Sequence, residues 1–379
     1  MLGNRKLILD TFCEVYDLLK PWADGEFWEF PNHEIVPGAI YVIGRKEFTK
    51  HYTTFRDMAK KDLAKIIFSN PAEGSETLLW QLNSVIPIAD LMHNKTMLLI
   101  GGGDMDSGWP CLQYDSFLPK LHDYEENIQA CNRSHEIFSR TQKPYKFLFL
   151  NGRARPHRKY LLERFAENQL LNQAIWSNLD ITACHNKRIE FLKDGKNLMD
   201  RLGQIKTLES KYEYTLYKDR VNLKSDLNYI KYNLFNNDWG EVYINPEPYI
   251  DSYFSVVTET VFDYPYSFRT EKIWKPIVMG HPWIAVANQG YYRDMHNLGF
   301  RTFGHLIDES FDQIENSQQR IERVAEVVEE LCQQDLTQFL SAAEETCKYN
   351  QQHYAEMRIK VRKEFPQRFF QFVNQYFHE

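Results

Sequence analysis

Residues 146–171 read KFLFLNGRARPHRKYLLERFAENQLL. The run at 146–150 is short and apolar, as in a buried strand, and residues 157–171 carry apolar side chains at helical spacing. The loop between them ends at Pro156, which suits the first turn of the following helix because its missing N–H has no partner there. A strand, a polar loop and a helix in this order are the repeating unit of a parallel α/β sheet.

The same alternation extends in both directions from this stretch. Apolar runs that end in turn-forming or polar residues predict further strands. These strands are expected at residues 39–43, 65–68, 97–100, 253–260, 283–288 and 300–303. Residues 270–280 are expected to form a helix, as are segments after residue 311, the last of them rich in aromatic residues. The sequence therefore predicts an α/β fold.

The length of 379 residues exceeds the size at which one hydrophobic core usually keeps growing, so two domains are expected. A polar stretch around Lys143-Pro144 is typical of a domain crossing, because proline disfavours helix in the residue before it. The predicted organisation is an N-terminal domain at 1–142 and a C-terminal ligand-binding domain at 143–350. A final helix at 351–379 is expected to return toward the first domain.

The composition excludes several classes of protein. Lys and Arg total 45 against 52 Asp and Glu, so the net charge of −7 does not suit a phosphate polymer, and any anion site must be local. The six cysteines form no C-x-x-C pair, which argues against a zinc site and a disulfide framework. No apolar run approaches the roughly 20 residues that span a bilayer. We expect a cytoplasmic protein without membrane contact.

The loop after residue 150 is the first candidate site. It carries Asn151, Arg153, Arg155, His157 and Arg158 around a predicted helix N-terminus. Helix N-termini attract anions, and arginine donors suit phosphate oxygens, so this pattern predicts a cradle for a diphosphate. A solvated basic loop would have the same composition, and a nucleic-acid site using these arginines is a further alternative that the acidic balance disfavours.

The second candidate site is the start of the helix expected at residues 270–280. Thr270 can cap this helix, and a carboxylate at Glu271 is favoured in its first turn. The same carboxylate can accept hydrogen bonds from two ribose hydroxyls, while Lys272 supplies a positive charge for a phosphate. Ordinary helix capping with a surface lysine would give the same pattern. Pro276 predicts a kink or an early stop.

Thr270-Glu271-Lys272, followed by an apolar helix that ends at Gly280-His281-Pro282 and by a hydrophobic strand, resembles a known donor-binding signature. It is similar to that of the alpha-1,3-fucosyltransferase family and related GT-B glycosyltransferases. That family also has an upstream strand ending near an asparagine and an arginine opening the next helix. Asn151 and Arg158 match both positions in order and spacing. The likeness covers about residues 145–310.

The resemblance implies a GT-B fold, in which two Rossmann-like domains with parallel sheets face across a cleft and C-terminal helices pack back. It also implies inverting transfer of a sugar, with fucose as the first choice, from a GDP-linked donor to a glycan or another hydroxyl acceptor. Arg158 would then pair with the diphosphate, Glu271 with the ribose and Lys272 with a phosphate. No cofactor or metal is expected. A non-catalytic nucleotide- or sugar-binding protein on the same fold is the alternative.

An inverting transfer requires a base that removes the acceptor's hydroxyl proton. The candidates are Glu73 and Glu76, beyond the run at 65–68, and Asp104 and Asp106, beyond the run at 97–100. Glu73 is preferred because a loop residue can face a ligand, and Asp104 is the alternative. The triplet 104–106 also matches the D-x-D pattern that holds a cation in GT-A enzymes, but such triplets often arise by chance. The oligomeric state is left open.

Overall fold

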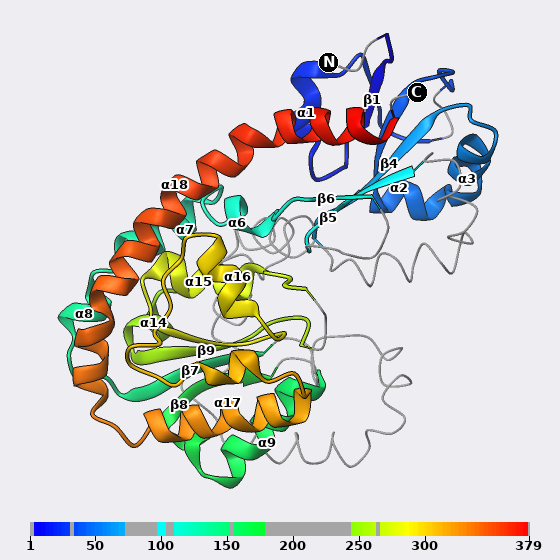
Figure 1. The fold of residues 1–379 in the computed structure, drawn as a ribbon. Coiled ribbons are helices and arrows are strands. Elements are labelled where there is room, and N and C mark those ends of the chain that lie inside the picture. The colour runs from blue at the N-terminus through cyan, green and yellow to red at the C-terminus, as the bar shows by residue number, and fades with distance from the viewer. Residues whose placement is uncertain are drawn as a thin grey trace, which may run out of the picture. The chain divides into compact units, whose positions relative to one another are not determined.

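The computed structural model describes residues 4–30, 34–72, 97–103, 110–151, 155–178, 244–262 and 266–377. Within these ranges the chain forms two compact units, each containing a parallel sheet with helices (Figure 1). Unit 1 comprises Met1–Pro119, Tyr266–Arg269 and Glu356–Glu379, and unit 2 comprises Lys120–Pro265 and Thr270–Ala355. The expected α/β class with two Rossmann-like parallel sheets is confirmed, whereas the domain boundaries at 142 and 350 stay predictions.

Unit 1 is built on six parallel strands in the order β2-β1-β3-β4-β5-β6. The strands are β1 (Leu7–Asp10), β2 (Gly25–Phe27), β3 (Ile40–Gly44), β4 (Lys65–Asn70), β5 (Met97–Gly101) and β6 (Cys111–Gln113). The three strands expected in the first third of the sequence correspond to β3, β4 and β5, and each is confirmed. After β5, Gly102 passes so close to the chain that a Cβ there would lie 2.2 Å from the Pro71 carbonyl oxygen. This close approach explains the glycine at that position.

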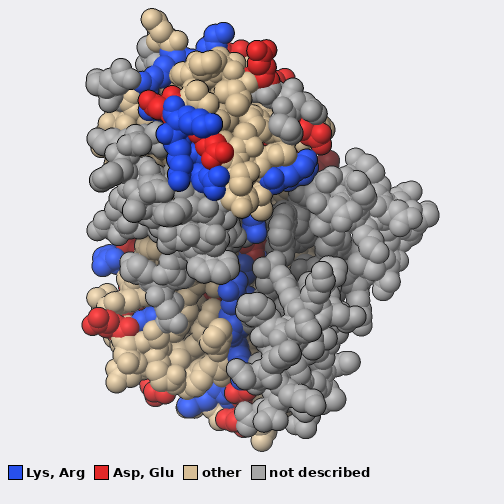
Figure 2. Space-filling view, turned by 90° about the vertical axis from the view of Figure 1, so that its right-hand side faces the viewer, with Lys and Arg blue, Asp and Glu red and all other residues tan. Residues whose placement is uncertain are grey.

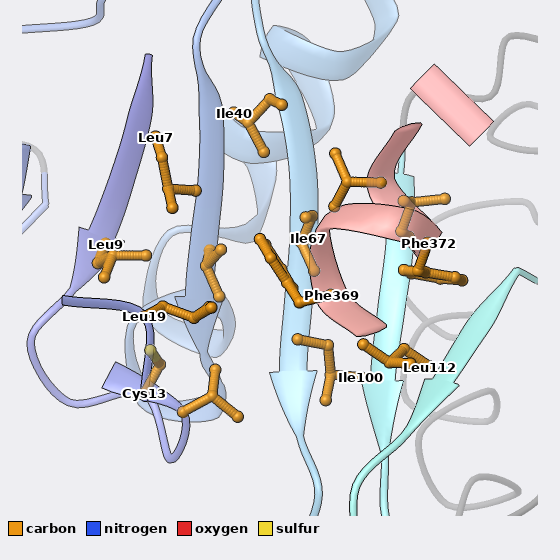
Figure 3. Close-up of a cluster of buried hydrophobic side chains, with 14 of the residues drawn as sticks. Leu7, Leu9, Cys13, Leu19, Ile40, Ile67, Ile100, Leu112, Phe369 and Phe372 are labelled. Carbon is orange, nitrogen blue, oxygen red and sulfur yellow. The ribbon is translucent and has the colours of Figure 1, made fainter. Parts of the chain in front are cut away.

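Side chains of the unit 1 strands alternate between two buried faces, as the period of two in a strand requires. On one face, Tyr41 and Phe68 pack with α2 (Arg45–Lys50) and α3 (Tyr52–Lys60). On the other, Leu7, Leu9 and Ile67 pack with Leu19 of α1 (Tyr16–Leu19) and with Phe369 and Phe372 of the C-terminal helix (Figure 3). Both faces are therefore covered, which is the usual state of a parallel sheet.

The C-terminal helix α18 (Leu336–Phe377) has 42 residues. Its residues up to Ala355 belong to unit 2 and the remainder to unit 1, so the expected return of the chain end to the first sheet is confirmed. Across the described ranges, no helix combines the length and apolar character needed to cross a membrane. α18 contributes residues to both units.

Unit 2 contains four parallel strands in the order β10-β9-β7-β8. The strands are β7 (Tyr145–Asn151), β8 (Ala174–Asn178), β9 (Ser252–Thr258) and β10 (Trp283–Val286). Helices α9 (Pro156–Glu167) and α17 (Ser317–Leu331) lie side by side (Figure 1). Arg164 joins them, because its Nε and Nη2 donate to the two carboxylate oxygens of Glu329 at 2.7 and 3.0 Å.

The strand expected at residues 300–303 is wrong, because this segment pairs with no strand that the structure describes. Phe300 and Phe303 are both buried, but they pack as separate anchors: the Phe300 ring lies 5.4 Å from that of Trp274, and the Phe303 ring 5.7 Å from that of Trp283. The apolar pattern of this segment thus comes from two buried aromatic residues three positions apart and not from a strand.

Helix α15 (Glu271–Met279) confirms the helix expected at 270–280. Thr270 is its N-cap, and the Thr270 hydroxyl accepts a hydrogen bond from the main-chain N–H of Lys272. Gly280 ends the helix with φ of 66°, the left-handed conformation that favours glycine. The helix continues past Pro276 to Met279, so the early stop is wrong. Its buried side chains, including Trp274 and Ile277, hold the helix against the core and compensate for the hydrogen bond lost at proline.

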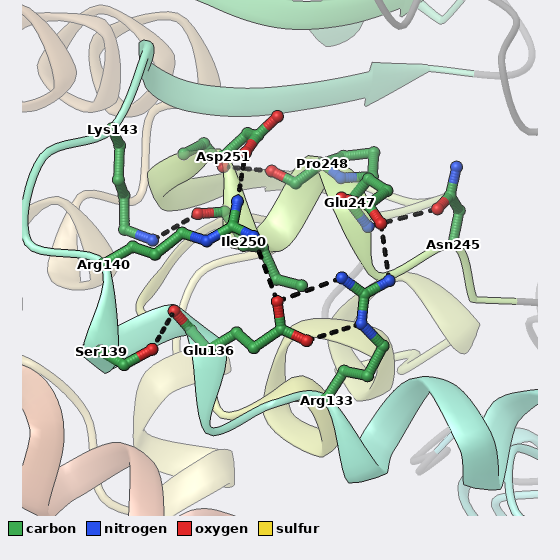
Figure 4. A network of polar contacts seen from close by, with 11 residues as sticks. Arg133, Glu136, Ser139, Arg140, Lys143, Asn245, Glu247, Pro248, Ile250 and Asp251 are labelled. Atoms are coloured by element: carbon green, nitrogen blue, oxygen red, sulfur yellow. Dashed lines mark hydrogen bonds and ion pairs between the residues drawn. The ribbon is translucent and has the colours of Figure 1, made fainter.

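A polar network fastens the chain before β7 to the chain before β9 (Figure 4). It connects α7 (Glu125–Asn132), α8 (Glu136–Ser139) and α14 (Glu247–Ile250). Arg133 donates to Glu136 and to Glu247, each at 2.6 Å, and the Lys143 ammonium donates to the Ile250 carbonyl at 2.5 Å.

The remaining elements of the described ranges are α6 (Phe117–Lys120), α16 (Tyr291–Asn297) and 3-10 turns at Lys20–Trp22, Leu170–Gln173 and Ser310–Gln313.

Candidate functional site

The candidate site lies in unit 2, where the neighbouring strands β7 and β9 end. Asn151 is the last residue of β7, and its side-chain oxygen accepts a hydrogen bond from the Thr258 hydroxyl at 2.6 Å. Thr258 is the last residue of β9. In parallel α/β sheets, ligands usually bind beyond the carboxyl ends of the strands. The predicted residue Asn151 thus fixes the spacing of two strand ends at the edge where a ligand is expected.

The first turn of α9 is bonded to the end of β9. The Arg158 Nη2 donates to the carbonyl oxygens of Thr258 and Glu259, both at 3.0 Å. His157 Nε2 donates to the same Glu259 oxygen at 2.9 Å, and the His157 ring stacks on Phe262 with 5.2 Å between centroids. Both side chains are buried. They hold the helix start and the strand end in one fixed arrangement.

The pKa of His157 is affected by the charged groups around it. Burial, together with the positive charges of Arg158, Arg155 and Lys272, lowers its pKa to about 3, against the opposing effect of the bond to Glu259. The imidazole is therefore neutral at physiological pH, with Nε2 carrying the proton that it donates. Arg155, Arg158 and Lys272, from two separate segments of the sequence, thus all lie near enough to act electrostatically on His157.

The start of α15, which follows β9 in the sequence, also contacts the end of β9. The Lys272 ammonium lies 2.6 Å from a Glu271 carboxylate oxygen and donates to the hydroxyls of Thr270 and Thr260 at 3.2 and 3.3 Å. Burial alone would raise the pKa of Glu271, but the positive charges of Lys272 and Lys275 outweigh it, and the pKa lies below its usual value. Glu271 is thus an ionised hydrogen-bond acceptor, and Lys272 is its half-buried partner.

Glu259 connects these parts and was not among the predicted site residues. Its carboxylate accepts hydrogen bonds from the Thr270 main-chain N–H at 3.1 Å, the Thr270 hydroxyl at 2.6 Å and the Tyr291 hydroxyl at 3.0 Å. Burial raises the pKa of Glu259, and the attraction of Lys272 offsets part of this rise. Because Thr270 caps α15 and Tyr291 begins α16, Glu259 fastens two helix starts to the end of β9.

A sequence signal for Glu259 did exist. The acid directly follows an apolar strand pattern, at the carboxyl end where ligand sites gather. The prediction placed it inside a strand at 253–260, but β9 ends at Thr258.

The assembled site is suited to an anion. Arg155, Arg158 and Lys272 supply three cationic groups against the two carboxylates of Glu259 and Glu271. Arg155 is the N-cap of α9, and its side chain makes no capping bond to the first turn. The positive end of the α9 dipole therefore adds to the side-chain charges. Oxygen-rich anions with several negative charges, such as a diphosphate, match this arrangement.

Several predicted residues fall outside the described ranges. These are Arg153 in the first candidate loop and the proposed bases Glu73, Glu76, Asp104 and Asp106. Within the described ranges, no group of three or more His, Cys, Asp or Glu side chains is placed to share a metal ion. The predicted residues that the structure does bring together are Asn151, Arg155, His157, Arg158, Thr270, Glu271 and Lys272.

Comparison of the chain with protein-family models, with curated proteins and with solved structures gives no match. Any functional assignment therefore rests on the fold, on the arrangement of side chains at the ends of β7 and β9, and on the sequence pattern at Thr270-Glu271-Lys272.

Proposed function

We propose that the chain is an inverting glycosyltransferase. Its donor is a nucleoside-diphosphate sugar, GDP-linked and with fucose as the first candidate, and its acceptor is a hydroxyl of a glycan. The observation that carries the proposal is the convergence of Arg158 and Lys272, far apart in sequence, on residues Thr258, Glu259 and Thr260. The resemblance of Thr270-Glu271-Lys272 to a fucosyltransferase donor signature supplies the reaction class.

The proposed donor site assigns a role to each group. The diphosphate binds at the first turn of α9, where main-chain N–H groups and Arg155 face it, and Lys272 adds a second charge. Glu271 accepts hydrogen bonds from the ribose hydroxyls, for which its ionised carboxylate is suited. His157, Arg158 and Glu259 keep the two helix starts in place through their bonds to each other's segments.

In the proposed reaction the acceptor oxygen attacks the anomeric carbon of the donor sugar from the side opposite the phosphate. The bond from that carbon to the phosphate oxygen breaks, and the configuration inverts. The hydroxyl proton passes to a carboxylate base, for which Glu73 and then Asp104 are proposed. The nucleoside diphosphate leaves with an added negative charge, which Arg155 and Lys272 stabilise electrostatically.

Thermal unfolding in the presence of GDP, UDP and CMP tests the donor site. A ligand at 100 times its dissociation constant stabilises the folded state by about 2.7 kcal/mol. For a unit of this size, that corresponds to a rise of roughly 5–10 °C in Tm. Lys272→Ala should lose the rise, and Lys348→Ala, which removes a lysine from an exposed ion pair with Glu344, should keep it. A folded protein that no nucleotide stabilises would contradict the proposal.

A non-catalytic nucleotide-binding protein is the second candidate. One observation favours it: the buried guanidinium of Arg158 already donates to two main-chain carbonyls, which is a structural use of the residue that the resemblance assigns to the diphosphate. Slow hydrolysis of a GDP-sugar by the wild-type protein, lost in Glu73→Ala, would support the enzyme. Binding of the GDP-sugar without any turnover, with or without glycan, would support the second candidate.

Nucleic-acid binding is a third possibility that we do not propose. Figure 2 shows described Lys and Arg side chains in an upper group with Asp and Glu beside them and in a short vertical row below it. A nucleic-acid site more often presents an extended basic stripe. Salt-dependent binding of an oligonucleotide, measured by fluorescence anisotropy, would overturn this view.

A further inference from the structure

Two large aromatic side chains of unit 1 are exposed next to each other. Trp28 is 66% exposed and Phe12 is 43% exposed. Their ring centroids lie 4.7 Å apart with an edge-to-face angle of 62°, and the Lys46 ammonium lies 4.5 Å from the centre of the Phe12 ring. An isolated exposed apolar residue is ordinary, but an ordered aromatic pair with a cation beside it resembles a binding surface.

These three residues follow the carboxyl ends of three neighbouring strands. Phe12 comes two residues after the end of β1, Trp28 directly follows β2, and Lys46 is the second residue after β3. Because β2, β1 and β3 are adjacent and parallel, all three side chains lie at one edge of the sheet. This is the edge at which α/β sheets bind ligands.

The backbone that carries Phe12 is fixed by a buried carboxylate. Asp10 accepts a hydrogen bond from the Phe12 N–H at 2.9 Å with one oxygen, and from the Gly44 N–H at 2.9 Å with the other. Asp10 is fully buried. It therefore ties the loop after β1 to the end of β3, close to Lys46.

The backbone around Trp28 is fixed on both sides. The Thr11 N–H donates to the carbonyl of Phe27, the residue before Trp28, at 3.1 Å. The Phe30 N–H, two residues after Trp28, donates to the buried carboxylate of Glu47 at 3.0 Å. The exposed indole is thus held on a short segment with an anchor at each end. A preorganised surface loses little entropy when a ligand binds.

We propose that Phe12, Trp28 and Lys46 form a carbohydrate-binding platform on which a pyranose ring of the acceptor stacks. The face of an aromatic ring is electron-rich, and the C–H groups on one face of a pyranose carry partial positive charge, so the two attract. Lys46 then donates hydrogen bonds to sugar hydroxyls. The assignment of this sugar as the acceptor rests on the proposed function.

The size and surroundings of the platform favour a sugar over a protein partner. Among the described residues, the exposed aromatic side chains here are these two rings, and the exposed carboxylates of Glu26 and Glu29 lie within two positions of Trp28 in the sequence. Protein interfaces bury a much wider surface, on the order of 800 Å² per partner. One sugar ring, with an apolar face and a polar rim, matches the area and the composition.

Saturation-transfer NMR and calorimetry with a panel of disaccharides of glucose, galactose, mannose and N-acetylglucosamine test the platform on the full chain. Trp28→Ala and Phe12→Ala should each weaken disaccharide binding, roughly tenfold for the tryptophan. Trp22→Ala is the matched control: Trp22 is 49% exposed in the same unit but precedes β2, at the opposite edge of the sheet. It should bind like the wild type.

The outcomes separate this inference from the proposed function. If no disaccharide binds, or if Trp28→Ala binds as tightly as the wild type, the platform is refuted, whatever the result with nucleotides. If the wild-type chain self-associates in sedimentation and Trp28→Ala abolishes this, the surface is an interface between copies and the inference is overturned. Disaccharide binding through Trp28 without any nucleotide binding would support the platform and contradict the donor site.

Discussion

Replacement of Glu259 by glutamine is the most revealing single change in unit 2, because one carboxylate fastens two helix starts to the end of β9. Its oxygens accept hydrogen bonds from the Thr270 N–H, the Thr270 hydroxyl and the Tyr291 hydroxyl. Glutamine has the same shape but carries an NH2 group in place of one acceptor oxygen. Whichever oxygen is replaced, a main-chain N–H, that of Thr270 at one oxygen or that of Thr260 at the other, then faces the NH2 group.

The magnitude follows from the bonds that are lost. A hydrogen bond to a charged group contributes roughly 1.5–3 kcal/mol, and a buried donor left unsatisfied costs about 1–3 kcal/mol. Burial of the Glu259 carboxylate, which raises its pKa, offsets part of the gain from its ionised form. We therefore expect Glu259→Gln to lower the free energy of unfolding by roughly 2–4 kcal/mol. Tyr291→Phe, which removes one donor and leaves the bonds to Thr270, should cost about 1 kcal/mol.

Urea unfolding followed by circular dichroism measures both variants, and hydrogen exchange of residues 270–280 locates the effect. The start of α15 should exchange faster in Glu259→Gln than in Tyr291→Phe, because only the first variant disturbs both bonds to Thr270. If Glu259→Gln unfolds at the same urea concentration as the wild type, Glu259 is not the connection described above. The site would then have to be held together by Arg158 and His157 alone.

Three further predictions follow from other parts of the molecule. The pKa of His157 is lowered, mainly by burial, to about 3 in the folded protein, against 6.5 in the unfolded chain, so the unfolded state binds more protons between these two pH values. The free energy of unfolding should therefore be highest above pH 6.5 and about 2 kcal/mol lower at pH 5, and His157→Gln should flatten this pH dependence in urea titrations. Gly280→Ala should lower the free energy of unfolding by about 1–2 kcal/mol, because the φ angle of Gly280 is 66° and the new Cβ would lie 2.6 Å from the Gln351 side chain. Adding Gln351→Ala should recover part of the loss in Tm by removing this steric contact. Phe369→Ala should destabilise unit 1 by about 3–5 kcal/mol, since this fully buried ring packs α18 on the sheet, and nucleotide binding by unit 2 should persist at temperatures where the variant is folded.

The sequence predicted the parts of the fold whose signals are local. The apolar runs that correspond to β3, β4, β5 and β7 are bounded by polar or turn-forming residues, so the apolar pattern and the turn signals at its ends both indicate a strand. The cap at Thr270 and the left-handed Gly280 likewise follow from short-range backbone chemistry. β1 was missed because its three apolar residues lie between charged residues, and its burial depends on strands and a C-terminal helix distant in sequence.

The candidate site divides in the same way. Arg158 and Lys272 could be predicted, because each lies in the first turn of a helix whose start the sequence indicates, through Pro156 and Thr270 respectively. The position of Glu259 after a strand pattern carried a signal, but its bonding partners could not be predicted, since Thr270 and Tyr291 lie 11 and 32 positions further along the chain. The platform at Trp28 has no sequence signature either: exposure of one tryptophan among eight is decided by packing.

A crystal structure of the protein with bound GDP is the most direct test of the central claim that the first turn of α9, with Arg155, and Lys272 surround one nucleoside diphosphate. The diphosphate should lie within hydrogen-bond distance of the first-turn N–H groups of α9 and of the Lys272 ammonium, with the ribose hydroxyls on Glu271. A nucleotide bound elsewhere on unit 2, or crystals in which GDP at saturating concentration leaves the ends of β7 and β9 unchanged and unoccupied, would contradict it.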